Sequence, residues 1–325
     1  MGGSSVRHGL GTEGVLTGVE QTLATRVRCT GIGLHSGNPV DVVLRPAAAG
    51  TGILFVRSDL GRNVCFPARA EWVIDTLLAT SLGSPEVRLS TVEHLIAALR
   101  GMGVDNCTVE VSGPELPIMD GSAAPFVYLI QQAGLRPQRR MRRRFVIHRP
   151  IEVRDGNRWV RVVPSRSFKV SMTIDYPHPA IGRQSLEATL TRRDVFARTI
   201  APARTFGFLR EVQELQARGL ARGGSLQNAI VVDEARVLNR EGLRFPDEFV
   251  RHKILDLIGD LALLGLPLQG HVKAMRGGHA LNQALVAQIR ANPSCWTVEV
   301  PGTPVAEPRT ERARLPRLTP VRDVG

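Results

Sequence analysis

Residues 249–258 read Phe-Val-Arg-His-Lys-Ile-Leu-Asp-Leu-Ile. This otherwise apolar stretch is typical of a helix, and it places His252 and Asp256 four residues apart on one helix face. An imidazole and a carboxylate on the same face are two ready ligands for a divalent metal. Asp260 follows one turn later, where it would orient a ligand imidazole or lie exposed. The stretch predicts a helix with polar groups beside a core-facing stripe, and a surface ion pair between His252 and Asp256 is the ordinary alternative.

The sequence around this helix repeats one order of elements. In each half, strand-rich segments precede a helix, a strand and a second helix. The expected helix, strand and helix cover residues 90–101, 106–111 and 121–132 in the first half, and residues 246–265, 271–275 and 280–290 in the second half. The first of these helices opens with Ser90 and Glu93 at the spacing of a capping box. A chain of 325 residues is long for one core, so we predict two copies of one α+β unit.

Composition divides the chain into segments. The start is rich in glycine, residues 136–144 hold six arginines and one proline, and the end is rich in proline. Such stretches are typical of leaders, linkers and disordered tails. We expect a flexible leader (1–20), a first α+β domain (21–136), an Arg-rich linker (137–144), a second α+β domain (145–300) and a disordered Pro/Arg tail (301–325).

Further side chains could join His252 and Asp256 in one site. If the halves pack helix against helix, the helix with Glu93 and His94 faces the helix with His252, and their polar groups meet at the domain interface. Neighbouring helix positions point about 100° apart, so His94 could bind a metal while Glu93 acts as a base. His279 opens another helix after two glycines. Two imidazoles and a carboxylate would leave a position for water, as in catalytic zinc sites, although each element alone is also common in ordinary helices.

The net charge of +12 favours an anionic partner. The distribution of the charge weakens that argument, because six arginines lie in residues 136–144 and five more follow Pro301. Both groups are typical of solvated linker or tail charge. Aromatic residues make up only 5% of the chain and do not alternate with the arginines, as they do on nucleic-acid-binding surfaces. A basic nucleic-acid-binding protein is therefore the alternative function, and we expect no nucleic acid partner.

No stretch of the sequence has the character of a membrane or export signal. No apolar run approaches the roughly 20 residues that span a bilayer, and residues 1–20 lack the apolar segment of a secretory signal. The cysteines, Cys29, Cys65, Cys107 and Cys295, are scattered without C-x-x-C spacing, which is typical of buried free thiols in a reducing compartment. We predict a cytoplasmic protein without a transmembrane segment.

Several stretches of the sequence form a specific set. They are Thr-Gly-Ile-Gly-Leu-His-Ser-Gly (30–37), Ser-Thr-Val-Glu-His-Leu (90–95), Val-Asp-Asn (104–106), Glu-Leu-Pro-Ile-Met-Asp-Gly-Ser-Ala-Ala-Pro-Phe-Val (115–127), Ala-Arg-Thr-Phe-Gly-Phe (203–208), Gly-Leu-Arg-Phe-Pro-Asp-Glu-Phe-Val-Arg-His-Lys-Ile-Leu-Asp-Leu-Ile-Gly-Asp (242–260) and Gly-His-Ala-Leu-Asn (278–282). Together they resemble the family of bacterial UDP-3-O-acyl-N-acetylglucosamine deacetylases of lipid A synthesis (LpxC). The resemblance covers about residues 20–300.

The resemblance implies both a fold and a reaction. The implied fold is α+β, with two similar domains, each a sheet layered on helices, packed helix layer to helix layer in a two-layer β-α-α-β sandwich. The implied reaction is hydrolysis of the N-acetyl group of UDP-3-O-acyl-N-acetylglucosamine to UDP-3-O-acyl-glucosamine and acetate, the committed step of lipid A biosynthesis. The implied metal is Zn²⁺, with Fe²⁺ as the alternative, and we expect a monomer.

The resemblance also implies a role for each candidate residue. The implied roles are zinc ligands for His94, His252 and Asp256, general base for Glu93, general acid for His279, oxyanion stabilisation and substrate binding for Lys253 and Thr205, a partner of the acid for Asp260, and substrate contact for Phe206. Residues 207–232 resemble an insert that forms a passage for the acyl chain.

The sequence departs from the family pattern at two positions. Gly277 replaces a usual serine, which puts the loop geometry before His279 in question, and Gln283 replaces a usual asparagine. A metal-free interaction protein of the same fold is a further hypothesis. The presence of the implied ligands, base and acid argues against it.

Overall fold

Two five-stranded sheets of identical strand order organise the chain. The computed structural model describes residues 18–60 and 64–300, so the expected tail and most of the expected leader lie outside the described residues. In the first half, neighbouring strands are β2 (Val27–Ile32), β3 (Pro39–Pro46), β9 (Cys107–Val111), β4 (Ile53–Arg57) and β5 (Val64–Pro67). In the second half they are β12 (Ile151–Asp155), β13 (Arg158–Val163), β19 (His271–Met275), β14 (Lys169–Asp175) and β15 (Arg183–Thr189). In both sheets the strand that comes last in the chain occupies the centre.

The direction of each central strand pair is also the same in the two sheets. β9 is antiparallel to β3 and parallel to β4, and β19 is antiparallel to β13 and parallel to β14. In register, Leu44 pairs with Val109, and Val160 pairs with Ala274. Alternate residues of β3 and β14 are buried, because one face of a half-covered sheet packs on the core and the other meets solvent. This shared topology supports the prediction of one α+β unit present twice.

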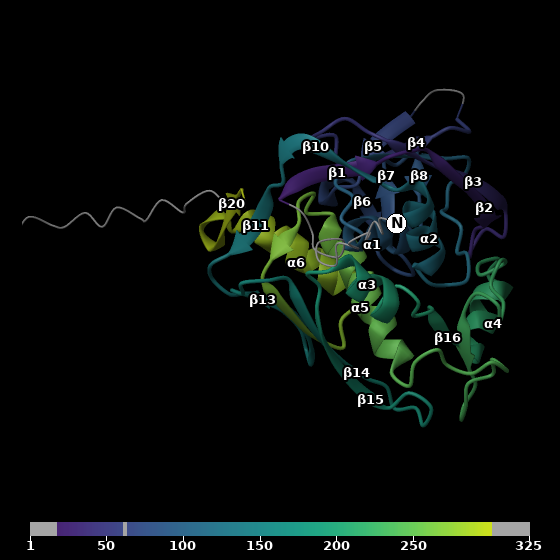
Figure 1. The fold of residues 1–325 in the computed structure, drawn as a ribbon. Helices are drawn as coiled ribbons and strands as arrows, with labels where there is room; N and C mark the ends of the chain where they lie inside the picture. The colour runs from purple at the N-terminus through teal and green to yellow at the C-terminus, as the bar shows by residue number, and fades with distance from the viewer. Residues whose placement is uncertain (1–17, 61–63, 301–325) are drawn as a thin grey trace, which may run out of the picture.

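Core helices lie between the two sheets. They are α1 (Glu93–Gly101), α2 (Ala124–Ala133), α5 (Glu248–Ala262) and α6 (His279–Ala291), and Figure 1 shows α1, α5 and α6 at the centre of the molecule with β14 and β15 on one side and β2 to β4 on the other. Every residue of α5 except Arg251 and Lys253 is buried, as in a helix surrounded by protein. A side chain at Gly259 would lie 2.3 Å from the carbonyl oxygen of Glu93, so this glycine lets α5 cross α1 at backbone contact. The predicted α+β sandwich, packed helix layer to helix layer, is confirmed.

Each half contains an insert of extra elements at the same point along the chain. The inserts follow β5 in the first half and β15 in the second half, and each precedes the first core helix of its half. The first insert holds the 3₁₀ helix η1 (Ala70–Trp72) and strands β6 (Val73–Asp75), β7 (Ser81–Gly83) and β8 (Arg88–Leu89). The second insert holds α3 (Arg193–Thr199), β16 (Phe206–Phe208), α4 (Leu209–Ala217) and β17 (Ile230–Val232). β16 and β17 pair in parallel, so residues 207–232 form a small unit of their own.

The arginine run expected as a solvated linker is largely a strand. β10 (Leu135–Met141) pairs with β1 (Val19–Leu23), while β11 (Arg144–Ile147) joins β18 (Leu268–Gln269) and β20 (Trp296–Glu299), the last after the 3₁₀ helix η2 (Pro293–Cys295). Arg140 Nε lies 3.2 Å from Glu20 Oε1, and Arg142 Nη2 lies 2.6 Å from Asp105 Oδ2. Composition suggested solvated charge because a sequence does not show which carboxylates lie on neighbouring strands. The position of the boundary between the halves stays a prediction.

The expected capping box at the start of α1 is wrong. The N-cap residue is Val92, and no side chain caps the helix there. Thr91 has a positive φ of 59°, and its hydroxyl donates to Glu115 Oε1 at 3.3 Å. The Glu93 carboxylate accepts the backbone N–H of Thr80 at 3.1 Å instead of a helix N–H. The Ser90 hydroxyl oxygen accepts from Ser81 Oγ at 3.0 Å and from Arg88 Nε at 2.8 Å, so neither capping-box side chain bonds to the first turn of α1.

No helix within residues 18–60 and 64–300 is long and apolar enough to cross a bilayer. All four cysteines are free thiols, as predicted, but the expectation that they are buried is wrong for Cys65, which is exposed, and holds fully only for Cys107. Burial raises the pKa of the Cys107 thiol to about 12, so this side chain stays protonated and serves as a small core residue.

Candidate active site

Three potential metal ligands converge where α1 crosses α5. His94 comes from α1, and His252 and Asp256 come from successive turns of α5. Their ligand atoms all lie within 4.8 Å of one another, with Asp256 Oδ1 3.3 Å from His252 Nε2 and 3.7 Å from His94 Nε2. All three residues are buried. The i, i+4 spacing puts two ligands on one face of α5, and the close crossing at Gly259 brings in the third from the other half.

The surroundings of these ligands fit a divalent cation. Among the described residues, the buried Asp256 Oδ1 has no hydrogen-bond partner, and a buried charge is costly unless it is paired or binds a metal. His252 Nδ1 donates to the carbonyl oxygen of Ala203 at 3.0 Å. This bond keeps the ring proton on Nδ1 and leaves the lone pair of Nε2 free for a metal. The donor set and its partners therefore suit a metal site rather than a surface ion pair.

The protonation states of the ligands also suit a metal. Burial lowers the pKa of His252 to about 4, against the opposing charge of Asp256. Burial would raise the pKa of Asp256, but His252 and Lys253 hold it well below its usual range. At neutral pH the imidazole is neutral and the carboxylate is ionised, which are the forms that coordinate metals.

Lys253 adds a fixed positive charge beside the ligands. Its Nζ donates to Asp256 Oδ2 at 2.6 Å, the oxygen that does not face the two imidazoles. Burial alone would lower the pKa of Lys253, but the attraction of Asp256 raises it to about 12. The ammonium group therefore stays charged at any physiological pH, and it lines the cleft next to the ligands.

Glu93 and His279 lie close together next to the potential ligands. Glu93 Oε1 lies 3.9 Å from His279 Nε2, and both residues line the cleft. Burial raises the pKa of Glu93, although the nearby imidazoles oppose this shift. Burial would lower the pKa of His279, but the charge and hydrogen bond of Asp260 raise it to about 9. Side chains with shifts of this kind in one cleft are typical of catalytic groups.

Asp260 has no exposed surface, and its carboxylate accepts several hydrogen bonds. Its Oδ2 accepts from His279 Nδ1 and from Asn282 Nδ2, each at 2.8 Å. Its Oδ1 accepts the hydroxyl of Thr80 at 2.5 Å and lies 3.3 Å from Gln283 Nε2. Asp260 is therefore neither an exposed acid nor a metal ligand, and it orients the imidazole of His279. Gln283, where the family pattern has asparagine, is one of its partners.

Arg204 and Glu248 form a buried ion pair that the sequence did not reveal as a pair. Arg204 Nε donates to Glu248 Oε1 at 2.9 Å, and the two side chains are 3% and 0% exposed. The backbone N–H of Arg204 donates to the same oxygen at 3.0 Å. These bonds tie the segment before β16 to the first turn of α5, and so they hold the Ala203 carbonyl in place for His252. A scan for charges within the helical stretch would have found Glu248, but not its partner 44 residues away.

Thr205 and Phe206 follow this anchor and line the cleft. The Thr205 N–H donates to the Gly121 carbonyl at 2.8 Å, which links the two halves. The ring of Phe206 packs edge-on against Phe249 with centroids 5.0 Å apart and lies 6.4 Å from the ring of His252. The side chains singled out from the sequence therefore lie together. All of them line the cleft except Asp260, which is buried behind His279.

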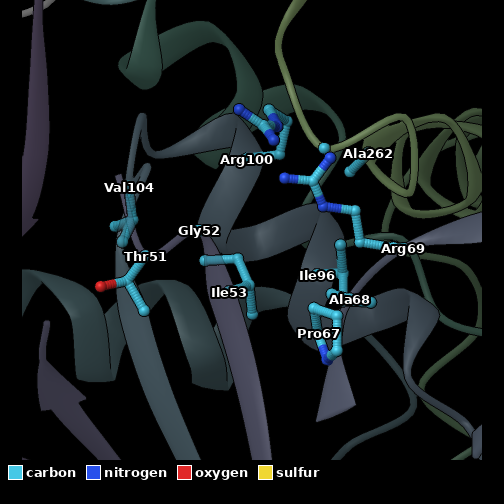
Figure 2. Close-up of a pocket in the computed structure, with 11 residues that line it drawn as sticks. Thr51, Gly52, Ile53, Pro67, Ala68, Arg69, Ile96, Arg100, Val104 and Ala262 are labelled. Atoms are coloured by element: carbon cyan, nitrogen blue, oxygen red, sulfur yellow. The ribbon is translucent and has the colours of Figure 1, made fainter. Parts of the chain in front are cut away.

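The cleft between the halves has a volume of about 930 Å³. Besides the residues above, it is lined by side chains that sequence reasoning missed, among them Leu77, Leu78, Tyr176 and Arg276. A separate, smaller pocket lies at the other end of α1, where Figure 2 shows Arg69 and Arg100 above Ile96 and Pro67. Among the described residues, the lining of that pocket contains no histidine, cysteine or carboxylate. The large cleft, which is lined by His94, His252 and Asp256, is therefore the candidate site for metal-dependent chemistry.

Comparison with known proteins places the chain among deacetylases. The family model for LpxC, described as UDP-3-O-acyl N-acetylglycosamine deacetylase, matches residues 20–291. Relatives named UDP-3-O-acyl-N-acetylglucosamine deacetylase from Anaeromyxobacter sp. (strain Fw109-5) and Myxococcus xanthus (strain DK1622) are each 56% identical over 279 residues, covering 86% of this chain and 91% and 88% of their own lengths. A relative of the same name from Acidithiobacillus ferrooxidans (strain ATCC 53993 / BNL-5-31) is 50% identical over 278 residues, which cover 85% of this chain and 91% of its own. With a match over most of its length and a cleft that brings the family's motifs together, this chain belongs to the LpxC family of deacetylases.

Proposed function

We propose that this protein is a zinc-dependent deacetylase. It removes the N-acetyl group from UDP-3-O-acyl-N-acetylglucosamine and releases UDP-3-O-acyl-glucosamine and acetate, the committed step of lipid A biosynthesis. The observation that carries this proposal is the convergence of two imidazoles and a carboxylate in the cleft, with Glu93 and His279 beside them. The family match and the names of the relatives agree with it.

His94, His252 and Asp256 would hold the zinc ion. When bound, zinc supplies a Lewis acid for the acetamide carbonyl and lowers the pKa of a water ligand to about 7. Three protein ligands leave room for water and substrate, which distinguishes a catalytic site from a structural one. Iron(II) is the alternative metal, because imidazole and carboxylate ligands suit several divalent ions.

Glu93 acts as the general base that takes a proton from the attacking water. Its Oε2 accepts the N–H of Thr80, so Oε1, which lies toward His279, is the free oxygen. Burial raises the pKa of Glu93, and a carboxyl with a raised pKa is a stronger base in its ionised form. As the acetamide carbon becomes tetrahedral, its oxygen gains negative charge. The Lys253 ammonium and the Thr205 hydroxyl lie on the cleft wall to donate to that oxygen, and one such donor contributes about 3–4 kcal/mol.

His279 acts as the general acid that protonates the leaving amine. Its Nδ1 proton is held by Asp260, so Nε2 carries the proton that is transferred. Because the pKa of His279 is raised to about 9, the ring is cationic at neutral pH. After transfer, the neutral ring keeps its proton on Nδ1 and the amine leaves as the C–N bond breaks.

The β16–α4–β17 unit would contact the acyl chain. Phe206 and Phe208 each lie against Tyr176, with centroids 5.8 and 5.9 Å apart, and all three line the cleft close to the ligands. This aromatic wall offers an apolar path for a hydrocarbon chain. Action in the cytoplasm and as a monomer are further predictions from the sequence.

The test is acetate release from UDP-3-O-acyl-N-acetylglucosamine by the purified protein, together with metal analysis. We expect about one zinc ion per chain, and hydrolysis that a chelator abolishes and added zinc restores. Protein without bound metal, or hydrolysis that a chelator leaves unchanged, would overturn the proposal. The nucleic-acid alternative predicts binding that weakens steeply with salt instead, and the pairing of Arg140 and Arg142 with carboxylates argues against it.

A further inference from the structure

Thr80 contacts three residues of the proposed reaction on three different helices. It lies just before β7 and has no exposed surface. Its backbone N–H donates to Glu93 Oε2 on α1 at 3.1 Å. Its hydroxyl donates to Asp260 Oδ1 on α5 at 2.5 Å, and the hydroxyl oxygen lies 3.3 Å from His279 Nδ1 at the start of α6. One residue of the first insert therefore touches the base, the acid and the carboxylate that orients the acid.

The direction of each hydrogen bond follows from the number of protons. A threonine hydroxyl has a single proton, and the ionised Asp260 can only accept it. Toward His279, the Thr80 oxygen must therefore be an acceptor, and this is favourable only when Nδ1 carries a proton. Asp260 Oδ2 accepts that same proton at 2.8 Å. Two oxygens thus hold a proton on Nδ1, which turns Nε2 toward the cleft with the proton that the reaction transfers.

The main chain of Thr80 constrains the base in the same way. Its carbonyl oxygen accepts the N–H of Val92 at 3.3 Å, and its N–H binds the side chain of the next residue, Glu93. Both peptide groups of Thr80 therefore hold the first turn of α1. Oε2 of Glu93 is occupied by this bond, and Oε1 is left on the side of His279.

We propose that Thr80 is a positioning residue that aligns the general acid and the general base across the two halves. This inference rests on the proposed function, because it takes the roles of Glu93 and His279 from the same reaction. The hydroxyl orients Nε2 of the acid through Asp260 and Nδ1, and the backbone orients Oε1 of the base. A substitution of the Thr80 side chain removes the hydrogen bonds of the hydroxyl and keeps those of the backbone. The role of the hydroxyl can therefore be tested alone.

The experiment compares Thr80→Val with Thr80→Ser. Valine has nearly the shape of threonine without the hydroxyl, and serine keeps the hydroxyl. We expect Thr80→Val to lower kcat about 10–100-fold, the usual effect of removing a partner behind a functional group, while KM and zinc content stay nearly unchanged. We expect Thr80→Ser to recover most of the lost kcat.

Thr22→Val is the matched control. Thr22 is also fully buried, and its hydroxyl donates to the Asn106 carbonyl at 2.7 Å while accepting the N–H of Ala47 at 2.9 Å. Thr22 lies in β1 and does not line the cleft. Loss of the Thr22 hydroxyl in Thr22→Val should lower the melting temperature as much as Thr80→Val does and should leave kcat unchanged.

Three results would overturn the proposal. They are a wild-type kcat for Thr80→Val, a Thr80→Ser variant as slow as Thr80→Val, and a fall in kcat for Thr22→Val equal to that for Thr80→Val. Failure of the proposed function would look different, because the unmodified protein would then release no acetate.

Discussion

The two halves of the molecule share a scaffold and differ in what they attach to it. Both sheets have the same strand order, and the two inserts occupy equivalent positions in the chain, between β5 and α1 and between β15 and α5. The first insert is a small sheet in which Thr80 lies between β6 and β7, and the second is α3 followed by a β-α-β unit that begins with Phe206. The repeated part therefore builds the frame, and the unrepeated parts shape the cleft.

The helices show the same contrast in their polar groups. α1 supplies His94 and Glu93, one proposed ligand and the proposed base, whereas α5 supplies the other two proposed ligands as well as Lys253 and the buried carboxylate of Asp260. α6 opens with His279, whereas α2 opens with Ala124 and Pro125. Most residues of the proposed site therefore belong to the second half, and the first half adds the remainder through the crossing at Gly259. Substitutions in the first half, in the second half and at the crossing of α1 and α5 test this difference between the halves.

The largest effect is expected from Asp256→Ala, which removes a proposed metal ligand of the second half. Zinc content should fall to a trace and acetate release should disappear, because two imidazoles alone do not retain the metal. The loss also leaves the Lys253 ammonium, on a side chain that is only 15% exposed, without its partner, which costs about 3–5 kcal/mol of unfolding free energy. Metal analysis and denaturant unfolding measure the two effects. Asp194→Ala, which removes an acid from the surface of α3, is the control, and full metal retention in Asp256→Ala would show the His252–Asp256 pair to be structural.

Glu93→Gln tests the contribution of the first half. The amide keeps the size of the side chain and can still accept the Thr80 N–H, but it cannot take a proton. We expect kcat to fall about 10²–10⁴-fold with zinc content unchanged, measured by acetate release and metal analysis on the same sample. Glu110→Gln on β9, outside the lining of the cleft, should behave as wild type. An unchanged kcat in Glu93→Gln would remove this residue as the base.

Asp260→Asn tests whether the charge of Asp260 raises the pKa of His279, the proposed general acid of the second half. The pKa of His279 is about 9, and the acid works only when protonated, so activity should be lost as the pH rises through about 9. The substituted amide would lack the negative charge that raises this pKa, so the alkaline limb of the kcat profile should move to lower pH. Activity at neutral pH should also fall about 10–100-fold. A limb that stays in place would mean that another group donates the proton.

The smallest effect is expected from Gly259→Ala, which acts on the crossing itself. The new methyl group would lie 2.3 Å from the Glu93 carbonyl oxygen, so α1 must move away from α5. We expect a cost of about 1–3 kcal/mol in unfolding free energy and a loss of kcat, because Glu93 and His94 shift relative to the ligands of α5. In the control, Gly113→Ala, the methyl group would meet Val40 Cγ2 at an ordinary 3.5 Å. Equal stability and equal kcat for the two variants would show that α1 adjusts without cost.

Local patterns made part of the fold and site predictable. The helix expected over residues 246–265 is α5, Glu248–Ala262, because apolar spacing over successive turns reflects burial directly. The strand expected over residues 271–275 is β19. The capping box failed, and Arg140 and Arg142 are not solvated as expected, for the opposite reason. Their side chains bond to groups that tertiary packing brings near, as Thr80 bonds to Asp260 across 180 positions, and no local spacing contains that information.

By itself, the sequence determined the repeated order of helix and strand, the residue types of the site and the placement of His252 and Asp256 on one helix face. These properties depend only on helical and strand periodicity and on side-chain chemistry. Only the tertiary structure decided that His94 joins them, that Asp256 Oδ1 stays without a hydrogen bond among the described residues, and that Thr80 reaches three helices at once. Such distances depend on how closely α1 and α5 approach, and that approach is set by packing between the two halves rather than by spacing along either one.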